Sequence, residues 1–259
     1  MIIDGRELPE PAGTAGIPAD AVEHVPLPTG RPFELAAVAL GPTAADDDTA
    51  AVDAALADVV ARARAWVGDD GRPPLVIPLF GTLTVWGPHR TLVAGPADRL
   101  PQLKAAVVEF AALDGELHDI ERHLATLLPL VDADAPLAFE FADAALSRRG
   151  ELAGRFRDAV SLRRRLAVLA PALHVPAPQP PTLAGQLGER LRERTRIVDR
   201  AGFATEQADL LERVYTACGE RASDFAIARR QAALEWTIVV LLAAEVVLML
   251  VGALTTGTT

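Results

Sequence analysis

The segment "EWTIVVLLAAEVVLML" (residues 235–250) has the composition of a helix that crosses a membrane. A helix over residues 236–254 would be about 28 Å long, just enough for the ~30 Å hydrocarbon core of a bilayer. Roughly a dozen Leu, Ile, Val and Met side chains, at about −0.3 to −0.6 kcal/mol each, outweigh the about +3 kcal/mol of one carboxylate, Glu245. A buried core helix would need apolar cover on every side, and the polar end "TTGTT" provides none. We therefore expect a transmembrane helix over 236–254.

The charges on either side of this segment predict its orientation. Arg221, Arg229 and Arg230 precede it, and no charged residue follows it. Positive charge stays on the cytoplasmic side, and Trp236 occupies the position of an interfacial aromatic anchor. The N-terminus "MIIDGRELPEP" lacks the basic and apolar regions of a secretory signal. We expect a tail-anchored, single-pass protein of the cell (inner or plasma) membrane with its soluble part in the cytoplasm.

Glu245 lies in the middle of the predicted span, where a charge is least well solvated. Three explanations are open: it is protonated and donates a hydrogen bond to a neighbouring helix, it pairs with a basic group of a partner, or it is tolerated as a neutral acid. Ionisable groups inside membranes usually face protein, which favours a second copy of the chain or a partner span. Glu235, Trp236 and Glu245 are the predicted contacts with the membrane and within a homo-oligomer.

Composition and charge argue against a dedicated nucleic-acid-binding protein. The net charge is −10, and Lys104 is the only lysine among 25 basic residues. Nucleic-acid binders usually carry a basic face. A local contact with RNA through Arg163, Arg164 and Arg165 and the arginines of 190–200 stays open as an alternative. Cys218 is the only cysteine, which excludes an internal disulfide and favours a buried structural thiol.

The soluble part is expected to begin with an α/β head over 33–131, after a poorly ordered lead-in over 1–32. Its elements follow from apolar runs, helical spacing and turn residues. They are a strand in "PFELAAVAL" (32–40), a helix capped within 46–49 and ended by Gly68 and "DDG", two strands in "PLVIPLFGTLTVWG" (74–87) that bend at Gly81, a helix capped by Asp98, and a strand within 115–131 around "LATLLPLV". This β-α-β-β-α-β order predicts a ferredoxin-like fold of the α+β class.

A helical hairpin or stalk is expected over 136–234, broken by the proline-rich stretch "PALHVPAPQPPT" (171–182). Its last segment carries one apolar stripe and no proline before the span. We therefore expect stalk and span to form a single long helix. The residues of that stripe are Leu211, Val214, Tyr215, Cys218, Ala222 and Phe225.

The sequence has no Gly-rich phosphate loop and no HExxH, GxSxG or CxxC motif. "ELHDIERH" could be written as a metal site through Glu116, His118, Asp119, Glu121 and His123, but histidines five residues apart are a poor ligand pair. A solvated turn or strand face is the favoured interpretation. "DDD" (46–48) is interpreted as capping chemistry rather than magnesium binding. We predict no catalytic residue, no cofactor and no metal, and therefore no enzyme.

Two segments resemble a known family. "RRQAALEWTIVVLLAAEVVLML" (229–250) is similar to the C-terminal signature of the YagE family, the domain of unknown function 155, through Leu234, Glu235, Trp236 and Glu245. "PLFGTLTVWG" (78–87) resembles a strand of that family, and "ERTRIVDRAGF" (193–203) its penultimate helix. The residues of the strand motif are Gly81, Val85, Trp86 and Gly87.

The resemblance implies a membrane-associated protein without an established catalytic activity. Mitochondrial members of the family are tied to the support of translation at the inner membrane. We expect a non-enzymatic, membrane-anchored scaffold or assembly protein whose partners are the bilayer, a second copy and a membrane protein. A membrane tether for RNA or ribosomes is the alternative.

Overall fold

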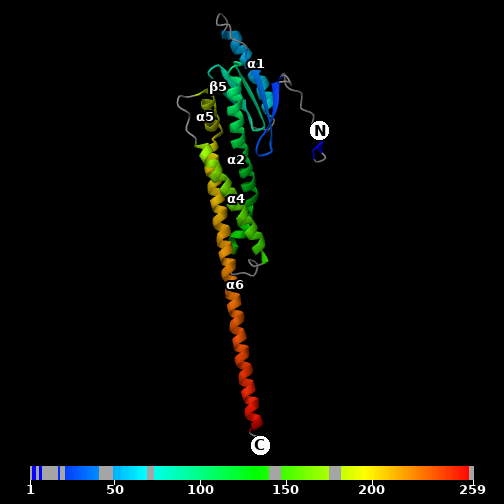
Figure 1. Cartoon of the computed structure of the whole chain (residues 1–259), viewed down its shortest axis with the longest axis vertical. Helices are drawn as coiled ribbons and strands as arrows, with labels where there is room; N and C mark the ends of the chain where they lie inside the picture. The colour runs from blue at the N-terminus through cyan, green and yellow to red at the C-terminus, as the bar shows by residue number, and fades with distance from the viewer. Residues whose placement is uncertain are drawn as a thin grey trace. The chain divides into compact units, whose positions relative to one another are not determined.

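The structure is a computed structural model, and it describes part of the chain in two compact units. The described residues are 2–3, 6–7, 17, 21–40, 49–68, 73–139, 147–174 and 182–256. The first unit comprises 1–122 with 165–204, and the second comprises 123–164 with 205–259. Three helices contribute residues to both units (Figure 1): α2 (Leu100–Asp134), α4 (Arg149–Leu173) and α6 (Ile197–Thr256).

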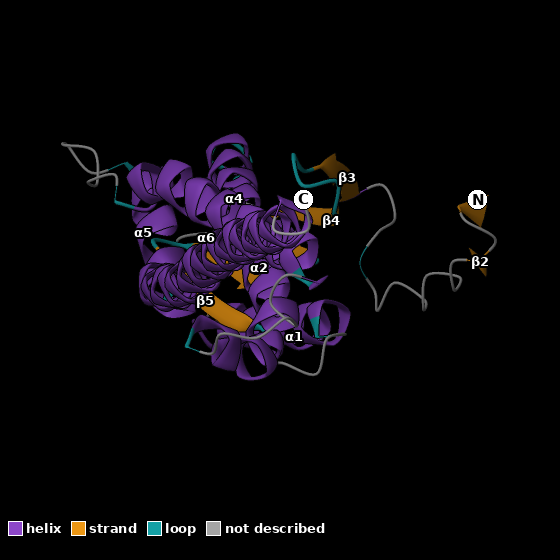
Figure 2. Cartoon of the chain, turned by 90° about the horizontal axis from the view of Figure 1, so that it is seen from below, coloured by secondary structure: helices purple, strands orange, loops and turns teal. Residues whose placement is uncertain are grey.

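The first unit is built on a five-stranded mixed sheet with the order β3-β4-β7-β6-β5. Its strands are β3 (Val22–Pro26), β4 (Pro32–Ala39), β5 (Leu75–Leu79), β6 (Thr82–Trp86) and β7 (Arg90–Gly95). Strands β4 and β7 run parallel, and the other neighbours run antiparallel. Figure 2 shows the edge strand β3 beside β4. A separate two-residue pairing joins β1 (Ile2–Ile3) to β2 (Arg6–Glu7). The expected α+β class is confirmed.

The two faces of the sheet are covered by different helices. Successive side chains of a strand point to opposite faces, so each central strand supplies both layers. On one face Val85 packs with Ala63 and Trp66 of α1 (Thr49–Val67). On the other face Trp86 meets Phe110 of α2 edge-on, with ring centroids 4.9 Å apart. The core therefore lies in two layers, one between α1 and the sheet and one between the sheet and α2.

The strand predicted within 115–131 is wrong, because these residues belong to α2. The apolar run "LATLLPLV" is contiguous in sequence, but the buried side chains follow a helical spacing from Leu117 through Ile120 to Leu124. Pro129 lies inside the helix, near its C-terminal end. No strand follows α2 within the described residues, so the ferredoxin-like order is not what this part of the chain forms.

Two strands of the sheet were not predicted. Val22–Pro26 forms the edge strand β3 inside the segment expected to be a lead-in, and Arg90–Gly95 forms the central strand β7. The strand β3 has a half-exposed pattern with no continuous apolar run. The predicted strand over 32–40 and the two strands bending at Gly81 are confirmed.

Helices make up the rest of the described chain. A short 3-10 turn (Ala135–Ala138) follows α2, and α5 (Leu183–Thr195) precedes α6. The Thr182 hydroxyl caps α5 by accepting a hydrogen bond from the Gly185 amide at 3.1 Å, and Arg196 ends it in a left-handed conformation. The prediction that stalk and span share one helix is confirmed by α6. The predicted cap residues 46–48 lie outside the described residues.

Candidate functional site

The predicted head motif lies in the core of the first unit. Val85 and Trp86 are buried, and the Trp86 ring also packs on Phe33, with centroids 6.0 Å apart. Gly87 is required by a close approach, since a Cβ there would lie 2.5 Å from Cγ1 of Val67. These residues therefore shape the interior.

Gly81 serves the tight turn between β5 and β6, where its φ is +74°. The preceding residue, Phe80, also has a positive φ of 46°, which is uncommon for a bulky side chain. Its backbone carbonyl accepts a hydrogen bond from Nη1 of Arg99 at 2.9 Å. The Phe80 ring is exposed at the tip of this hairpin.

The acidic cluster predicted as a solvated turn or strand face lies on α2 instead. Two of its carboxylates form ion pairs with arginines of other helices. Arg165 Nε lies 2.7 Å from Glu116, and Arg200 donates to both carboxylate oxygens of Glu121 at 2.8 and 2.7 Å. Asp119 pairs with Arg122 on the same helix. Among the described residues no group of three His, Cys, Asp or Glu side chains could hold a metal ion.

Arg200 also donates to the buried carboxylate of Asp114 at 2.6 Å. Burial alone lowers the pKa of Arg200, but the hydrogen bonds and negative charges of Glu121 and Asp114 outweigh burial and raise it. The guanidinium therefore stays charged and joins two carboxylates of α2 to α6. A cavity of about 300 Å³ opens beside this pair and is lined by Val67, Pro73, Pro74, Leu75, Trp86, Gly87, Pro88, Asp114, Thr195 and Arg200.

The second unit holds a fully buried carboxylate, Asp134, which the sequence did not single out. Arg148 lies 2.7 Å from one of its oxygens, and Arg155 and the Tyr215 hydroxyl reach the other, the hydroxyl at 3.2 Å. The thiol of Cys218 lies 3.5 Å from the backbone carbonyl oxygen of Asp134 and donates to it. The signal available in sequence was a pair of acids, Asp132 and Asp134, at the end of an apolar run, without their partners.

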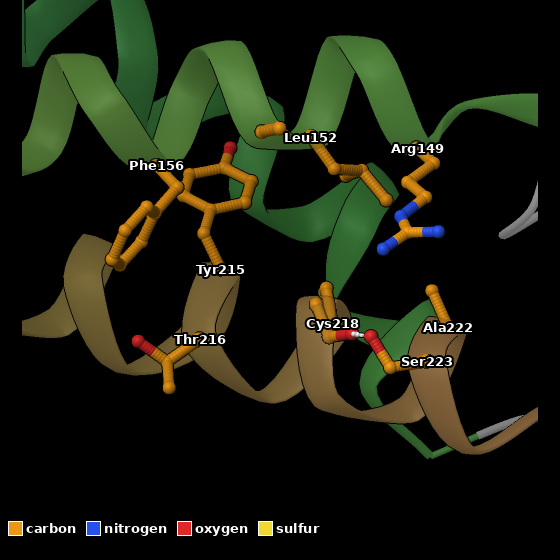
Figure 3. A pocket seen from close by; sticks show the side chains of 10 residues that line it. Arg149, Leu152, Phe156, Tyr215, Thr216, Cys218, Ala222 and Ser223 are labelled. Carbon is orange, nitrogen blue, oxygen red and sulfur yellow. Dashed lines mark hydrogen bonds between the residues drawn. The ribbon is translucent and has the colours of Figure 1, made fainter.

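A cavity of about 340 Å³ lies between α4 and α6 in the second unit (Figure 3). Leu152 and Arg149 point into it from α4, and Tyr215 and Cys218 from α6. Burial raises the pKa of the Cys218 thiol, although its own backbone and Arg148 oppose this. The predicted burial of Cys218 is confirmed.

The arginines considered for RNA are largely paired with acids. Arg163 bridges Asp209, at 3.2 Å, and Glu212. Arg165 and Arg200 bind carboxylates of α2 as above, and Arg190 pairs with Glu193 at 2.9 Å. Guanidinium groups held by carboxylates present less free positive charge to a phosphate backbone.

The C-terminal part of α6 differs from every other helix in its surroundings. It is the one helix among the described residues that is long and apolar enough to cross a membrane, on length and composition alone, and its most apolar stretch is unburied. Glu235, Trp236 and Glu245 are all exposed on it. Of the basic residues before it, Arg229 and Arg230 are exposed, and Arg221 donates to the Phe139 carbonyl at 3.4 Å.

No family model, no curated protein and no solved structure matches the chain. The resemblance to the YagE family therefore stays a prediction.

Proposed function

We propose that this protein is a non-enzymatic, single-pass, membrane-anchored scaffold that self-associates through the stalk and the span. The observation that carries the proposal is the exposed apolar part of α6 up to Met249, which no other described part of the chain covers. An exposed apolar surface of this size marks a site of contact with a membrane or with protein. Insertion into a bilayer would remove it from water.

The arrangement of charge along α6 supports a cytoplasmic location for the folded units. Arg229 and Arg230 are exposed just before the apolar part, and the sequence that follows has no basic residue. Positive-inside orientation then keeps the folded units on the cytoplasmic side of the membrane. Trp236, 70% exposed, stands at the depth of the interface, where its indole N–H can meet water or lipid head groups.

The paired arginines favour the scaffold over a tether for RNA or ribosomes. Arg163, Arg165 and Arg200 each bind carboxylates of the same chain. The resemblance to the YagE family, through Trp236 and Glu245, agrees with an anchored protein of the inner or plasma membrane.

Blue-native migration of the full-length protein beside Glu245→Gln and Glu245→Leu, in one mild detergent, tests the proposal. We expect the wild type to migrate as an oligomer, Gln to keep most of it and Leu to lose it, since Gln still forms a hydrogen bond between helices and Leu does not. A monomeric wild type that brings down no partner would contradict self-association. Equal migration of the wild type and both variants would show that Glu245 does not hold the copies together.

A further inference from the structure

The first part of α6 within the second unit buries one apolar face, whereas the second part exposes apolar side chains all around, among them Val240 and Val247 in line with the buried face. In the first part the buried stripe runs through Ala208, Leu211, Tyr215, Cys218 and Ala222, which pack inside the unit. At about 100° per residue, Ile227 and Glu245 both lie about 140° around the helix from Ala222. The face that carries Glu245 is therefore not an extension of the face that the chain already covers.

The face that carries Glu245 can be followed along the helix in both directions. From Ile227 to Leu248 its positions alternate in steps of four and three, which is the spacing of a coiled-coil seam. All of its side chains are exposed, and its large apolar members are 57 to 72% exposed. The members of this seam are Ile227, Gln231, Leu234, Ile238, Leu241, Glu245 and Leu248.

Two of these side chains are polar, and both are self-complementary. The amide of Gln231 both donates and accepts, and so does the carboxyl of Glu245 when it is protonated. No described residue of the chain forms a hydrogen bond or ion pair with Glu245. A polar residue at a single seam position fixes register and oligomeric state in coiled coils.

We infer that the occupant of this seam is the same seam of a second copy, in a parallel and symmetric pair. All copies of one membrane-spanning chain insert in the same orientation, so identical residues lie at equal depth and each meets its like. Glu245 then lies opposite Glu245, and Gln231 opposite Gln231. This inference rests on the proposed function and adds to it the face, the partner and the register.

Cysteine crosslinking of the full-length protein in its membrane tests the register. Cys218 is the only native cysteine, so Cys218→Ala provides a background without thiols. Single cysteines replace Leu234, Ile238 and Leu241 on the seam. Their matched controls are the preceding residues, Ala233, Thr237 and Val240, at the same depth but about 100° around the helix.

Under a membrane-permeant oxidant, we expect the three seam positions to form disulfide-linked dimers about fivefold more than their controls, because the bond requires Cα atoms within about 7 Å. Adding Glu245→Leu to the Leu234→Cys variant should lower its dimer fraction about three- to tenfold, by removing a hydrogen bond inside the membrane. The same substitutions with Cys218 retained repeat the measurement without changing the interior, since that buried thiol faces away from the seam.

Equal or greater crosslinking at the controls would overturn the seam. Absent crosslinks at all six positions, with an oligomer still present on blue-native gels, would overturn the seam and leave self-association standing. Absent crosslinks together with a monomeric wild type would overturn both.

Discussion

Asp134 and Glu245 are both carboxylates with apolar sequence neighbours, but they differ in whether the same chain provides partners for them. Asp134 is fully buried, and Arg148, Arg155 and Tyr215 of the same chain bind it. Glu245 projects from an exposed apolar helix without a described partner. An acid that is satisfied within the chain contributes to the fold of a single copy, whereas an acid left unsatisfied in the membrane favours association.

The largest effect should come from breaking the buried cluster. Asp134→Ala removes the buried carboxylate shared by two arginines, which keep only the exposed Glu151, and should lower the free energy of unfolding by about 3–5 kcal/mol. Asp132→Ala, two residues earlier and exposed, should change it by no more than about 0.5 kcal/mol. Thermal unfolding of purified full-length variants in one mild detergent measures both. Glu245→Leu should leave this unfolding unchanged. If it lowered the free energy of unfolding as much as Asp134→Ala, the two acids would not differ in the way proposed.

The two faces of α6 can be separated by neighbouring leucines. Leu211 is fully buried, and Leu211→Ala should cost about 2–5 kcal/mol through lost contacts and a cavity. Leu210 is about half exposed, and Leu210→Ala should cost no more than about 0.5 kcal/mol. Chemical denaturation of both variants gives the difference. Similar losses at the two positions would mean that the buried stripe is not where the structure has it.

Asp114 offers an intermediate case, since its partner Arg200 is partly exposed. Arg200→Gln leaves Asp114 and Glu121 less well satisfied, and we expect a loss of about 1–3 kcal/mol. Arg190→Gln breaks only an exposed pair with Glu193 and should cost about 0.5 kcal/mol or less. Melting temperatures of the two variants, compared with the wild type, test this order. A lower melting temperature for Arg190→Gln than for Arg200→Gln would contradict this order.

The smallest effect should be a pH dependence from His118 beside the same cluster. Burial, and then the positive charge of Arg31, lower its pKa below 6.5. The unfolded chain therefore takes up a proton at higher pH than the folded chain, so this contribution to stability is complete above pH 6.5 and falls as the pH decreases towards the folded pKa. His118→Asn should flatten the melting temperature between about pH 7 and 5 relative to the wild type. A steeper dependence of the melting temperature on pH in His118→Asn would contradict the direction of the pKa shift of His118.

Much of the fold could be predicted because its signals are local. The helix from Leu100, the hairpin that turns at Gly81 and the single helix α6 each follow from spacing, turn residues or the absence of proline. The strand β3 was missed because it has no continuous apolar run and is held by its pairing with β4. The strand β7 was missed because its pairing with β4 and β6 cannot be read from the sequence. The false strand at 115–131 had the apolar density of a strand but the spacing of a helix.

The polar clusters could not be predicted from the sequence, because their members are far apart in it. Asp134 lies 14 and 21 positions from its two arginines and 81 from Tyr215. Asp114 lies 86 positions from Arg200. Glu245, by contrast, could be singled out at once, since its apolar neighbours adjoin it in the chain.

The continuity of α6 has a geometric consequence. The helix has no proline between Cys218 and Glu245, so their side chains keep a fixed angular offset of about 180°. If two copies contact each other through Glu245, the side of α6 that faces α4, where the cavity at Cys218 lies, is on the outside of the pair. Such a two-fold pair is closed by its symmetry, so each copy would carry one such cavity on its outer side.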